Sequence, residues 1–342
     1  MQDSDGNFVA FGEIMMRLNC PFGKRFQNSG SFDVLYGGAE ANVCVFLSRL
    51  GLKTRYITRL PENELAQGAL DQLQSFGVDT SCVEAGGSKM GLYFTEDGNL
   101  LRPSRVIYDR KDSSFAGITR GMIDWKKILD GASWFHWSGI APAVSETAAE
   151  VCLEALESAK EGGITISADF NYRSTLWNYG RHPSSVMPKL LSFCDVVTGD
   201  INSAAVYFGI TVDKQLKAEE QFRICASLIK QKLPSIRVLA MSFRQSDSMQ
   251  RQTYRGALFM DNAFYFSDSY NLPLIVDRIG SGDAFMGGLI YSIRYGSEPR
   301  KIIEFATVSG LLKHSIAGDM CLLSIKEIQD FIDHGANNRL IR

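Results

Sequence analysis

The sequence lacks the features that mark membrane, secreted or nucleic-acid-binding proteins. No run of about 18 apolar residues occurs, so nothing predicts a membrane-spanning helix. Residues 1–7 are polar and acidic, whereas a signal peptide begins with a basic stretch followed by an apolar one. The 36 Lys and Arg are balanced by 38 Asp and Glu, so the basic surplus typical of nucleic-acid-binding proteins is missing. We therefore expect a cytoplasmic protein with no nucleic-acid or membrane partner.

Cysteine pairs and two common nucleotide-binding loops are also missing from the sequence. The seven Cys include no Cys-x-x-Cys pair, and the four His have no metal-site spacing, so we expect buried thiols and structural histidines. No Gly-x-Gly-x-x-Gly follows the first predicted strand, which argues against a nicotinamide oxidoreductase. No Gly-x-x-x-x-Gly-Lys-Ser/Thr occurs, which excludes a P-loop.

Short β-rich runs alternate with stretches of helical periodicity along most of the chain. This alternation predicts a mostly parallel sheet with helices on both faces. No linker rich in proline or serine divides the chain, so we expect a single α/β domain over residues 1–342. The predicted helices are Ala39–Leu50, Leu65–Phe76, Ser145–Lys160 and Gln221–Lys232, and the predicted strands are Tyr56–Thr58, Trp134–Trp137, Ile164–Phe170, Val196–Thr198 and Val238–Met241.

Two segments, Ile14–Tyr36 and Lys89–Arg110, interrupt this alternation. Both are rich in Phe, Tyr, Arg and Gly and lack helical spacing, which predicts short antiparallel strands. The second contains the turn Glu96–Asn99 and is therefore expected to form a hairpin. We interpret the two insertions, residues 14–36 and 89–112, as a small β-sheet that covers a site from which water must be kept.

A glycine-rich turn, Asp277–Asp283, carries the strongest chemical signal. It reads Asp-Arg-Ile-Gly-Ser-Gly-Asp, follows the apolar run Leu272–Val276, which looks like a strand, and precedes a predicted helix. Backbone N–H groups at a helix N-terminus bind anions, and an aspartate beside them can accept the proton of an attacking hydroxyl. The alternative is a plain turn with an N-cap aspartate. The predicted catalytic residues are Asp283, Gly280, Ser281 and Gly282.

A second pair of glycines, Gly37 and Gly38, precedes Asn42 on the first turn of a predicted helix. Two glycines followed by an asparagine allow a hydroxylated ligand to approach the backbone closely, although a plain tight turn is the alternative. Taken together, this segment and Asp277–Asp283 resemble the glycine pair and the C-terminal signature of the ribokinase-like (PfkB) carbohydrate kinases. The resemblance implies a ribokinase-like three-layer fold, a sugar-binding Asn42 and a catalytic base at Asp283.

Five stretches resemble the 2-keto-3-deoxygluconate kinases within that family. They are Phe11–Met15, Tyr36–Asn42, Gly91–Phe94, Arg102–Arg110 and Asp169–Arg173. This resemblance implies phosphorylation of a small sugar acid, 2-keto-3-deoxygluconate to its 6-phosphate, with ATP as the donor and Mg²⁺ as the metal. The residues expected to bind the sugar acid are Gly37, Gly38, Asn42, Tyr93, Tyr108, Arg110, Asn171, Arg173 and Asp319.

The residues of the predicted lid fit such a ligand. Alternate residues of a strand share a face, so Val106, Tyr108 and Arg110 are expected to point the same way, with Tyr93 on the other half of the hairpin. Arg110 can bind a carboxylate with two parallel hydrogen bonds, which a neutral sugar does not need. The alternative is a lid core of tyrosines with a solvated Arg110. Arg173 follows the carboxyl end of a predicted strand, which is where doubly wound sheets bind ligands. The alternative is that it is a surface arginine of a loop without a role in binding.

The nucleotide side departs from the family pattern. Arg278 and Ile279 replace the usual threonines and Ser281 replaces an alanine of the signature. The glutamate of an Asn-x-x-Glu motif is missing near Asp200–Ser203, and Ser242–Gln245 stands where a glycine-rich turn normally follows a strand. The residues still expected to bind the nucleotide are Asp200, Ser242, Arg244, Gly280 and Gly282, and the sequence identifies no metal ligands.

Two other functions remain open. A kinase for a neutral sugar such as fructose or ribose would share the fold, although the position of Arg110 argues against it. A catalytically weak sugar-binding protein with a kinase fold would account for the altered nucleotide side. The outer face of the small sheet is rich in Phe and Tyr, and so small a sheet is not expected to be stable alone. Packing against the lid of a second subunit would cover this face, so we expect a homodimer.

Overall fold

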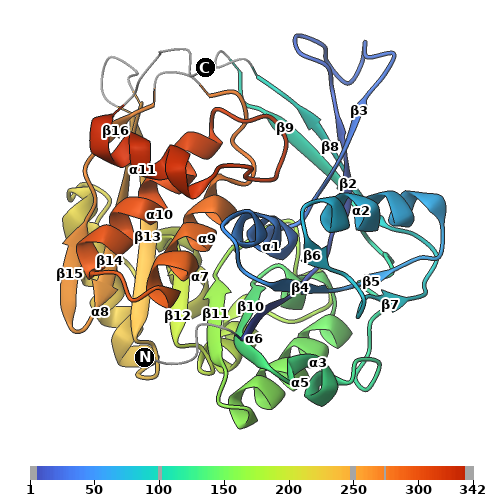
Figure 1. Cartoon of the computed structure of the whole chain (residues 1–342), viewed down its shortest axis with the longest axis horizontal. Coiled ribbons are helices and arrows are strands. Elements are labelled where there is room, and N and C mark those ends of the chain that lie inside the picture. Colours follow the sequence, from blue (N-terminus) through green and yellow to red (C-terminus); the bar gives the residue numbers. More distant parts are fainter. Residues whose placement is uncertain (1–5, 99–101, 247–251, 273–274, 336–342) are drawn as a thin grey trace.

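The computed structural model describes residues 6–98, 102–246, 252–272 and 275–335. Its centre is a ten-stranded sheet with the order β15-β14-β13-β12-β11-β10-β1-β4-β6, in which β16 also pairs with β14 (Figure 1). The strands from β6 to β13 pair in parallel, and β14, β15 and β16 pair antiparallel. The bounds are β1 Asn7–Phe11, β4 Thr54–Ile57, β6 Val78–Asp79, β10 Ala132–Ser138, β11 Thr165–Asp169, β12 Val196–Gly199, β13 Val238–Ser246, β14 Gln252–Met260, β15 Ala263–Phe266 and β16 Tyr270–Asn271.

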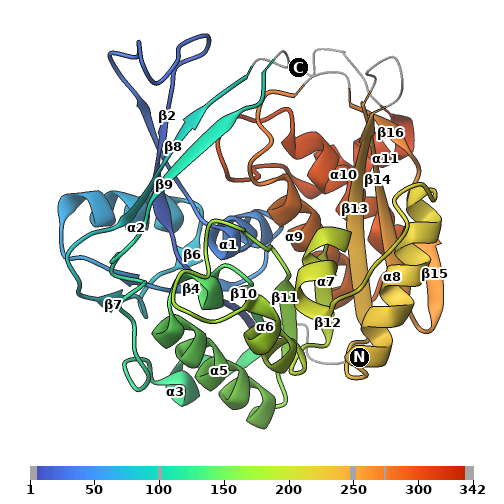
Figure 2. The ribbon, with the colours of Figure 1, turned by 180° about the vertical axis from the view of Figure 1, so that it is seen from behind.

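Helices cover both faces of this sheet, as the front and back views show (Figures 1 and 2). Because successive side chains of a strand point to opposite faces, Val9 and Phe11 of β1 pack in one core and Phe8 and Ala10 in the other. The first core is closed by α3 Trp125–Leu129, α5 Glu146–Glu161, α6 Pro183–Leu191, α7 Ile201–Phe208 and α8 Ala218–Lys232. The second is closed by α1 Ala39–Arg49, α2 Glu64–Ser75, α9 Ser281–Arg294 and α10 Pro299–Lys313.

A separate four-stranded sheet projects from the body, with the order β3-β2-β8-β9 (Figure 1). Its strands are β2 Met15–Asn19, β3 Asp33–Gly37, β8 Gly91–Glu96 and β9 Arg105–Asp109. The pairs β2–β3 and β8–β9 are antiparallel, as the sequence predicts, whereas β2 and β8 pair in parallel. The remaining elements are β5 Arg59–Leu60, β7 Glu84–Ala85, α4 Ala141–Val144 and α11 Ile325–His334.

Most of the predicted elements are confirmed to within a few residues, but one is not. The apolar run Leu272–Val276 is not a strand where it is described, because the N–H of Val276 bonds to the carbonyl of His314 instead of to a neighbouring strand. Residues 273 and 274 lie outside the described part. The predicted strand Val238–Met241 is longer than expected: β13 continues through Ser242–Gln245 in antiparallel register with β14, where the resembled kinases have a glycine-rich turn.

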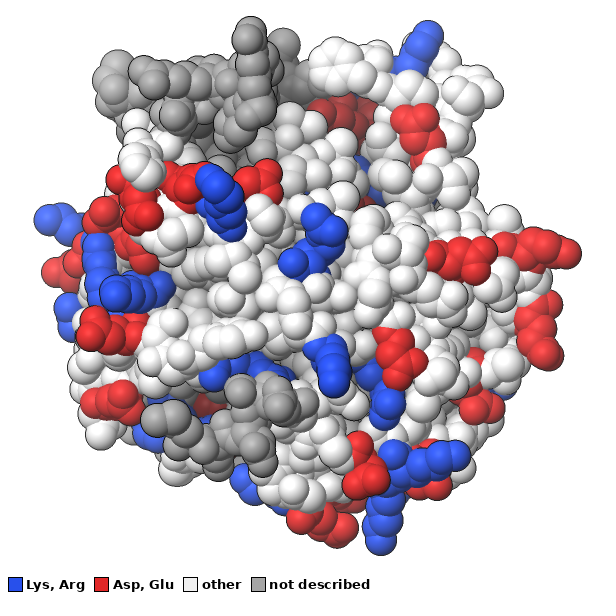
Figure 3. Space-filling view, viewed as in Figure 1, with Lys and Arg blue, Asp and Glu red and all other residues white. Residues whose placement is uncertain are grey.

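The surface carries charges of both signs side by side. On the face seen in Figure 3, Lys and Arg are interspersed with Asp and Glu, and a large part of the described surface there is uncharged. Among the described residues, no helix combines the length and the apolar character that crossing a bilayer requires. Six of the seven Cys are buried as free thiols, and Cys82 is half-buried.

Candidate active site

The turn Asp277–Asp283 leads into the N-terminus of α9. Gly280 is the N-cap residue and has a φ of 82°, a left-handed conformation that favours glycine. A Cβ at Gly280 would overlap the carbonyl oxygen of Asp319, so this position also needs glycine for space. The surroundings of Gly282 are open, because beyond its chain neighbours and the adjacent backbone of α9 no atom lies within 4 Å of where its Cβ would be. The first N–H groups of a helix have no acceptor within it, so this open turn can bind an anion.

The carboxyl group of Asp283 lies beside this turn and is held by Asn42. The Asn42 side chain, at the start of α1, donates a hydrogen bond of 2.7 Å to Asp283 Oδ2 across 241 residues of sequence. Burial raises the pKa of Asp283 to about 7, while the Asn42 hydrogen bond lowers it and the nearby Asp169, Glu40 and Asp319 raise it. The two glycine-containing motifs therefore meet at a carboxyl group whose pKa suits a general base at neutral pH.

Buried Lys313, the last residue of α10, lies beneath the turn. Its ammonium group donates hydrogen bonds to the carbonyls of Ile279 at 2.9 Å, Ile316 at 3.0 Å and Gly318 at 2.7 Å. Burial lowers the pKa of Lys313, while the nearby Asp277, Cys321, Asp319 and Asp283 raise it. Because three carbonyls from two loops share one ammonium group, Lys313 fixes the loop before α9 against the loop that carries Asp319.

The sugar-side residues predicted on the small sheet lie in one row. Tyr93 of β8 and Tyr108 of β9 are directly opposite each other, and their rings stack with centroids 5.9 Å apart. The Tyr93 hydroxyl donates a hydrogen bond to Asp319, which is buried. Gly37 allows Asp319 this position, because a Cβ at Gly37 would overlap its carboxylate. Burial raises the pKa of Asp319, while the adjacent Arg17 lowers it.

Arg110, directly after β9, is buried and has a protein partner. Its Nε donates a hydrogen bond of 2.8 Å to Glu13 Oε2, and its Nη2 bonds to the same oxygen. Glu13 also accepts a hydrogen bond of 2.6 Å from Ser113. The side of Arg110 that could form two parallel hydrogen bonds with a substrate carboxylate is therefore partly engaged by Glu13. The guanidinium also lies 5.8 Å from the centre of the Tyr108 ring.

A cavity of about 690 Å³ opens beside these residues. It is lined by Val106, Tyr108 and Arg110, which confirms that the three side chains share one face. Its other walls come from segments 111–117, 143–145 and 175–179. Of the predicted sugar-acid residues, Tyr108 and Arg110 line this cavity, and Asp283 is not among its lining residues.

Asn171 and Arg173 follow β11 at its carboxyl end. Asn171 has a φ of 39° and its N–H bonds to Asp169 Oδ1 at 3.2 Å. Arg173 is exposed, and its Nη1 bonds to the carbonyl of Tyr172 at 3.1 Å. Burial raises the pKa of Asp169 to about 6, while the nearby Arg173 guanidinium lowers it and Asp200 raises it. Arg173 therefore offers a cation near the carboxyl ends of the parallel strands, where ligands bind in doubly wound sheets.

The residues expected on the nucleotide side lie on three elements. Asp200 is the N-cap of α7, and its Oδ1 accepts hydrogen bonds from the N–H groups of Asn202 and Ser203. Ser242 and Arg244 lie within β13. Burial lowers the pKa of Arg244, and the nearby Arg278 guanidinium lowers it further. Among the contacts of the described residues, neither arginine has an ion pair, so two cations stand near the open N-terminus of α9.

No cluster of three or more His, Cys, Asp or Glu able to hold a metal ion occurs among the described residues. The carboxylates nearest to Asp283 include Asp169, and Asp200 lies near Asp169. Mg²⁺ is usually held by one or two carboxylates, by waters and by substrate phosphates, so this donor set fits an Mg²⁺ ion that arrives with a nucleotide.

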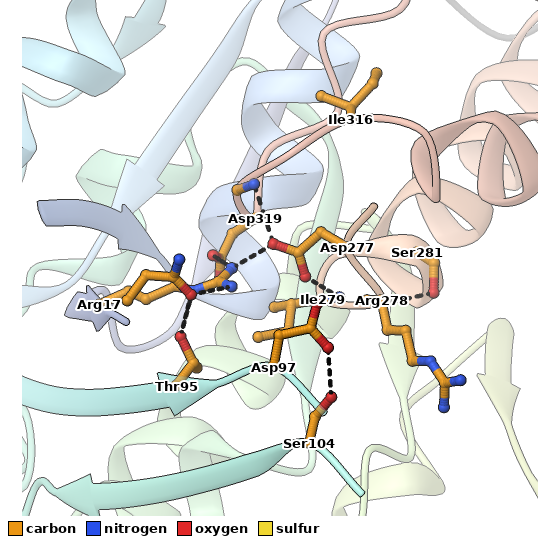
Figure 4. A network of polar contacts seen from close by, with 12 residues as sticks. Arg17, Thr95, Asp97, Ser104, Asp277, Arg278, Ile279, Ser281, Ile316 and Asp319 are labelled. Carbon is orange, nitrogen blue, oxygen red and sulfur yellow. Dashed lines mark hydrogen bonds and ion pairs between the residues drawn. The ribbon is translucent and has the colours of Figure 1, made fainter. Parts of the chain in front are cut away.

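Sequence reasoning missed three residues of this site. Arg17 of β2 binds Asp277 and Asp319, as the close-up shows (Figure 4). Lys313 and Glu13 were given no role either. The stretch Phe11–Met15 contains Glu13, but no local pattern indicates that its partner is Arg110. A lysine on an apolar helix face is the one signal in the sequence that could have drawn attention to Lys313.

Known proteins resemble the chain over almost its full length. The family model described as pfkB family carbohydrate kinase matches residues 5–232. A 2-dehydro-3-deoxygalactonokinase of Haloferax volcanii is 30% identical, with 96% of each chain covered. The crystal structure of a 2-dehydro-3-deoxygluconokinase of Thermotoga maritima has a TM-score of 0.90 and is 38% identical, covering 96% of this chain and 98% of that one.

Other solved structures extend the likeness of the fold. A putative 2-keto-3-deoxygluconate kinase of Enterococcus faecalis is 27% identical, covers 98% of both chains and has a TM-score of 0.88. A putative ribokinase of E. coli, 19% identical with a TM-score of 0.77, shares the fold. The predicted ribokinase-like fold, a mostly parallel sheet between helices with a separate small sheet, is confirmed. The chain belongs to the pfkB family of carbohydrate kinases.

Proposed function

We propose that this carbohydrate kinase transfers the γ-phosphoryl group of MgATP to the 6-hydroxyl of 2-keto-3-deoxygluconate. The observation that carries the proposal is the hydrogen bond between Asn42 and Asp283 at the open N-terminus of α9. It joins a polar group suited to a sugar hydroxyl, a base with a pKa of about 7 and an anion-binding turn at one point. The names of the relatives in Thermotoga maritima and Enterococcus faecalis support this sugar acid as the substrate.

In this mechanism the ionised carboxylate of Asp283 accepts the proton of the sugar hydroxyl as that oxygen attacks phosphorus. The N–H groups of Gly282 and Asp283 stabilise the charge of the transferring phosphoryl group. Gly280 and Ser281 shape the turn. Mg²⁺ enters with ATP and offsets phosphate charge, and we place Asp200, Ser242 and Arg244 with Arg278 along the nucleotide.

The sugar acid lies under the four-stranded sheet in this proposal, which makes that sheet a lid over one domain. Gly37 and Gly38 let the sugar approach the backbone. Its hydroxyls are contacted, directly or through neighbouring residues, by Tyr93, Tyr108, Asn171 and Asp319. The substrate carboxylate is bound by Arg173 and by the part of Arg110 that Glu13 leaves available. A neutral sugar would offer no anion to Arg173 or to the part of the Arg110 guanidinium that Glu13 leaves available.

The outer face of the lid supports a homodimer. One apolar residue from each of the four strands lies in a row on the face away from Tyr93. These residues are Val34, Leu18, Phe94 and Ile107. Val34 is 54% and Ile107 is 53% exposed, so an apolar row continues to both edges of the lid. A second lid packed on this row would remove it from water, and sedimentation at working concentration tests whether the mass is that of a dimer. We place the enzyme in the cytoplasm, where its buried free thiols stay reduced.

A coupled assay of ADP release tests the substrate. It compares 2-keto-3-deoxygluconate, its galactonate epimer, fructose and ribose, because the relative in Haloferax volcanii is named for the epimer. The proposal predicts that kcat/KM is highest for the gluconate form and lowest for the neutral sugars. Turnover of the acids no higher than that of fructose or ribose would contradict the assignment of a sugar acid.

Two controls separate a kinase from a binding protein with the same fold. Asp283→Asn should lose most of the rate and keep binding the sugar, whereas Asp333→Asn on α11 should retain the wild-type rate. Calorimetry with MgATP gives the second control. Binding of the sugar acid without binding of the nucleotide would favour a catalytically weak sugar-binding protein.

A further inference from the structure

Arg17 stands where the lid meets the body of the protein. It lies in the middle of β2, directly opposite Leu35 on β3 and Tyr93 on β8, and its side chain is only 6% exposed. Its Nη1 is 2.8 Å from Asp277 Oδ2 and 2.8 Å from Asp319 Oδ1, as Figure 4 shows. Its Nε and Nη2 donate hydrogen bonds within the lid, to Thr95 at 3.0 Å and to Asn19 at 3.0 Å.

The two carboxylates that Arg17 binds each hold part of the active site. Asp277 Oδ1 accepts a hydrogen bond of 3.0 Å from the N–H of Ile279, and Asp277 Oδ2 accepts one of 3.1 Å from Gly318. Asp319 accepts the hydroxyl of Tyr93 and lies against Gly280. A single guanidinium therefore connects the lid with the loop before α9 and with the loop that carries Asp319 (Figure 4).

These contacts require β2 to lie against the body, because they join a strand of the lid to two loops of the body. Two carboxylates that face each other with little solvent repel, and the guanidinium between them offsets that repulsion. Movement of β2 away from the body would withdraw this charge from both carboxylates together. The turn that binds the phosphoryl group would then lose a restraint at the moment when water gains access to the site.

We infer that Arg17 is a positioning residue that couples closure of the lid to formation of the phosphoryl-binding turn. This inference rests on the proposed function. Its consequence is that the turn is correctly shaped only when the lid covers the sugar acid, so transfer of the phosphoryl group to water is suppressed when no sugar is bound. Neither Asp277 nor Asp319 has to move far for this coupling, because a misplacement of about 1 Å can reduce a rate by about a hundredfold.

The test measures phosphoryl transfer to sugar and to water separately in Arg17→Met, Arg17→Lys and Arg102→Met. Arg102 is a matched control, because like Arg17 it is an arginine of the lid that binds a carboxylate. Its partner is Glu96 of the lid itself, at the outer end of the sheet, and not a residue of the body. We expect Arg17→Met to lower kcat/KM for the sugar acid by about tenfold to a hundredfold. The ratio of ATP hydrolysis to sugar phosphorylation should rise, and Arg102→Met should change neither quantity.

Arg17→Lys separates coupling from folding. A lysine keeps the charge between the carboxylates, and so the fold, but its compact ammonium cannot also reach Thr95 and Asn19 in the geometry of a guanidinium. We expect a thermal stability close to wild type together with a raised ratio of hydrolysis to transfer. A ratio that stays at the wild-type value in both Arg17 variants would overturn the inference, and a loss of stability alone would mean that Arg17 is only structural.

Amide hydrogen exchange gives a readout that does not depend on activity. Without Arg17, the backbone amides of residues 277–283 should exchange faster, and they should be unchanged in Arg102→Met. If the wild-type protein phosphorylates no sugar acid, the proposed function fails while this measurement still tests the coupling. Equal exchange in the wild type and in both Arg17 variants would show that the lid and the turn are not coupled.

Discussion

Asn42→Ala should move the acid limb of the pH–rate profile to higher pH. The Asn42 side chain donates a hydrogen bond of 2.7 Å to Asp283 Oδ2, and this bond lowers a pKa that burial raises to about 7. A hydrogen bond to a charged group contributes about 1.5–3 kcal/mol. One pKa unit corresponds to about 1.4 kcal/mol, so even the lower end of this range raises the pKa of Asp283 by about one unit when the donor is removed.

The size of the effect on rate follows from the ionised fraction of the base. At pH 7 the fraction of Asp283 that carries a negative charge should fall from about one half to about one tenth, a loss of about fivefold. At pH 9 the carboxyl group is almost fully ionised in both proteins, so this part of the loss should nearly vanish. Asn42→Ala can also weaken sugar binding, which would lower kcat/KM by the same factor at every pH.

The assay is kcat/KM for the sugar acid between pH 5.5 and 9.5, because kcat/KM reports the groups of the free enzyme. Wild type should show an acid limb near pH 7. Asp283→Asn should remove the limb together with most of the rate. A limb at the same pH in Asn42→Ala, with a uniform loss across the range, would refute the reasoning and leave Asn42 with a role in binding alone.

The remaining predictions concern stability around the turn. Asp283→Asn should raise the melting temperature at pH 8 by about 2–4 °C. The reason is that a carboxyl group with a raised pKa destabilises the folded state increasingly as pH rises from about 4 to 7, and a lower melting temperature in the variant would contradict the raised pKa. Gly280→Ala should destabilise the protein in thermal unfolding, since its φ is 82° and its Cβ has no room, whereas Gly282→Ala should leave stability unchanged and weaken only MgATP binding. Lys313→Met should lower the unfolding free energy in urea by about 3 kcal/mol or more, because three buried carbonyls lose their donor. Exposed Lys326→Met should change it by less than about 0.5 kcal/mol, and equal effects of the two lysine variants would count against the role of Lys313.

The sequence predicts the parts of this protein that local patterns encode. Strand–helix alternation locates the main sheet, and the glycines before α1 and α9 indicate where backbone must approach a ligand. The distance between Gly38 and Gly280 in the chain hides their proximity, and it is the resemblance to one kinase family that indicates a single site for the two motifs. The contact between Asn42 and Asp283 is consistent with that expectation.

Contacts between distant charged residues could not be predicted in the same way. Arg17 and Asp319 are separated by 302 positions, and no periodicity indicates which carboxylate a given arginine will bind. The expected free Arg110 shares its guanidinium with Glu13 for the same reason. The end of the expected strand at Val276 shows the opposite limit: an apolar residue does not extend a strand when its backbone N–H bonds to a carbonyl at a helix terminus, here that of His314.

A structure of the protein with 2-keto-3-deoxygluconate and a non-hydrolysable ATP analogue tests the central claim most directly. The account predicts that the 6-hydroxyl of the sugar acid lies within about 3 Å of an Asp283 carboxylate oxygen, with the γ-phosphate over the N–H groups of Gly282 and Asp283. The carboxylate of the sugar acid should face Arg110 and Arg173. A sugar bound away from Asp283, or a γ-phosphate remote from the N-terminus of α9, would contradict it.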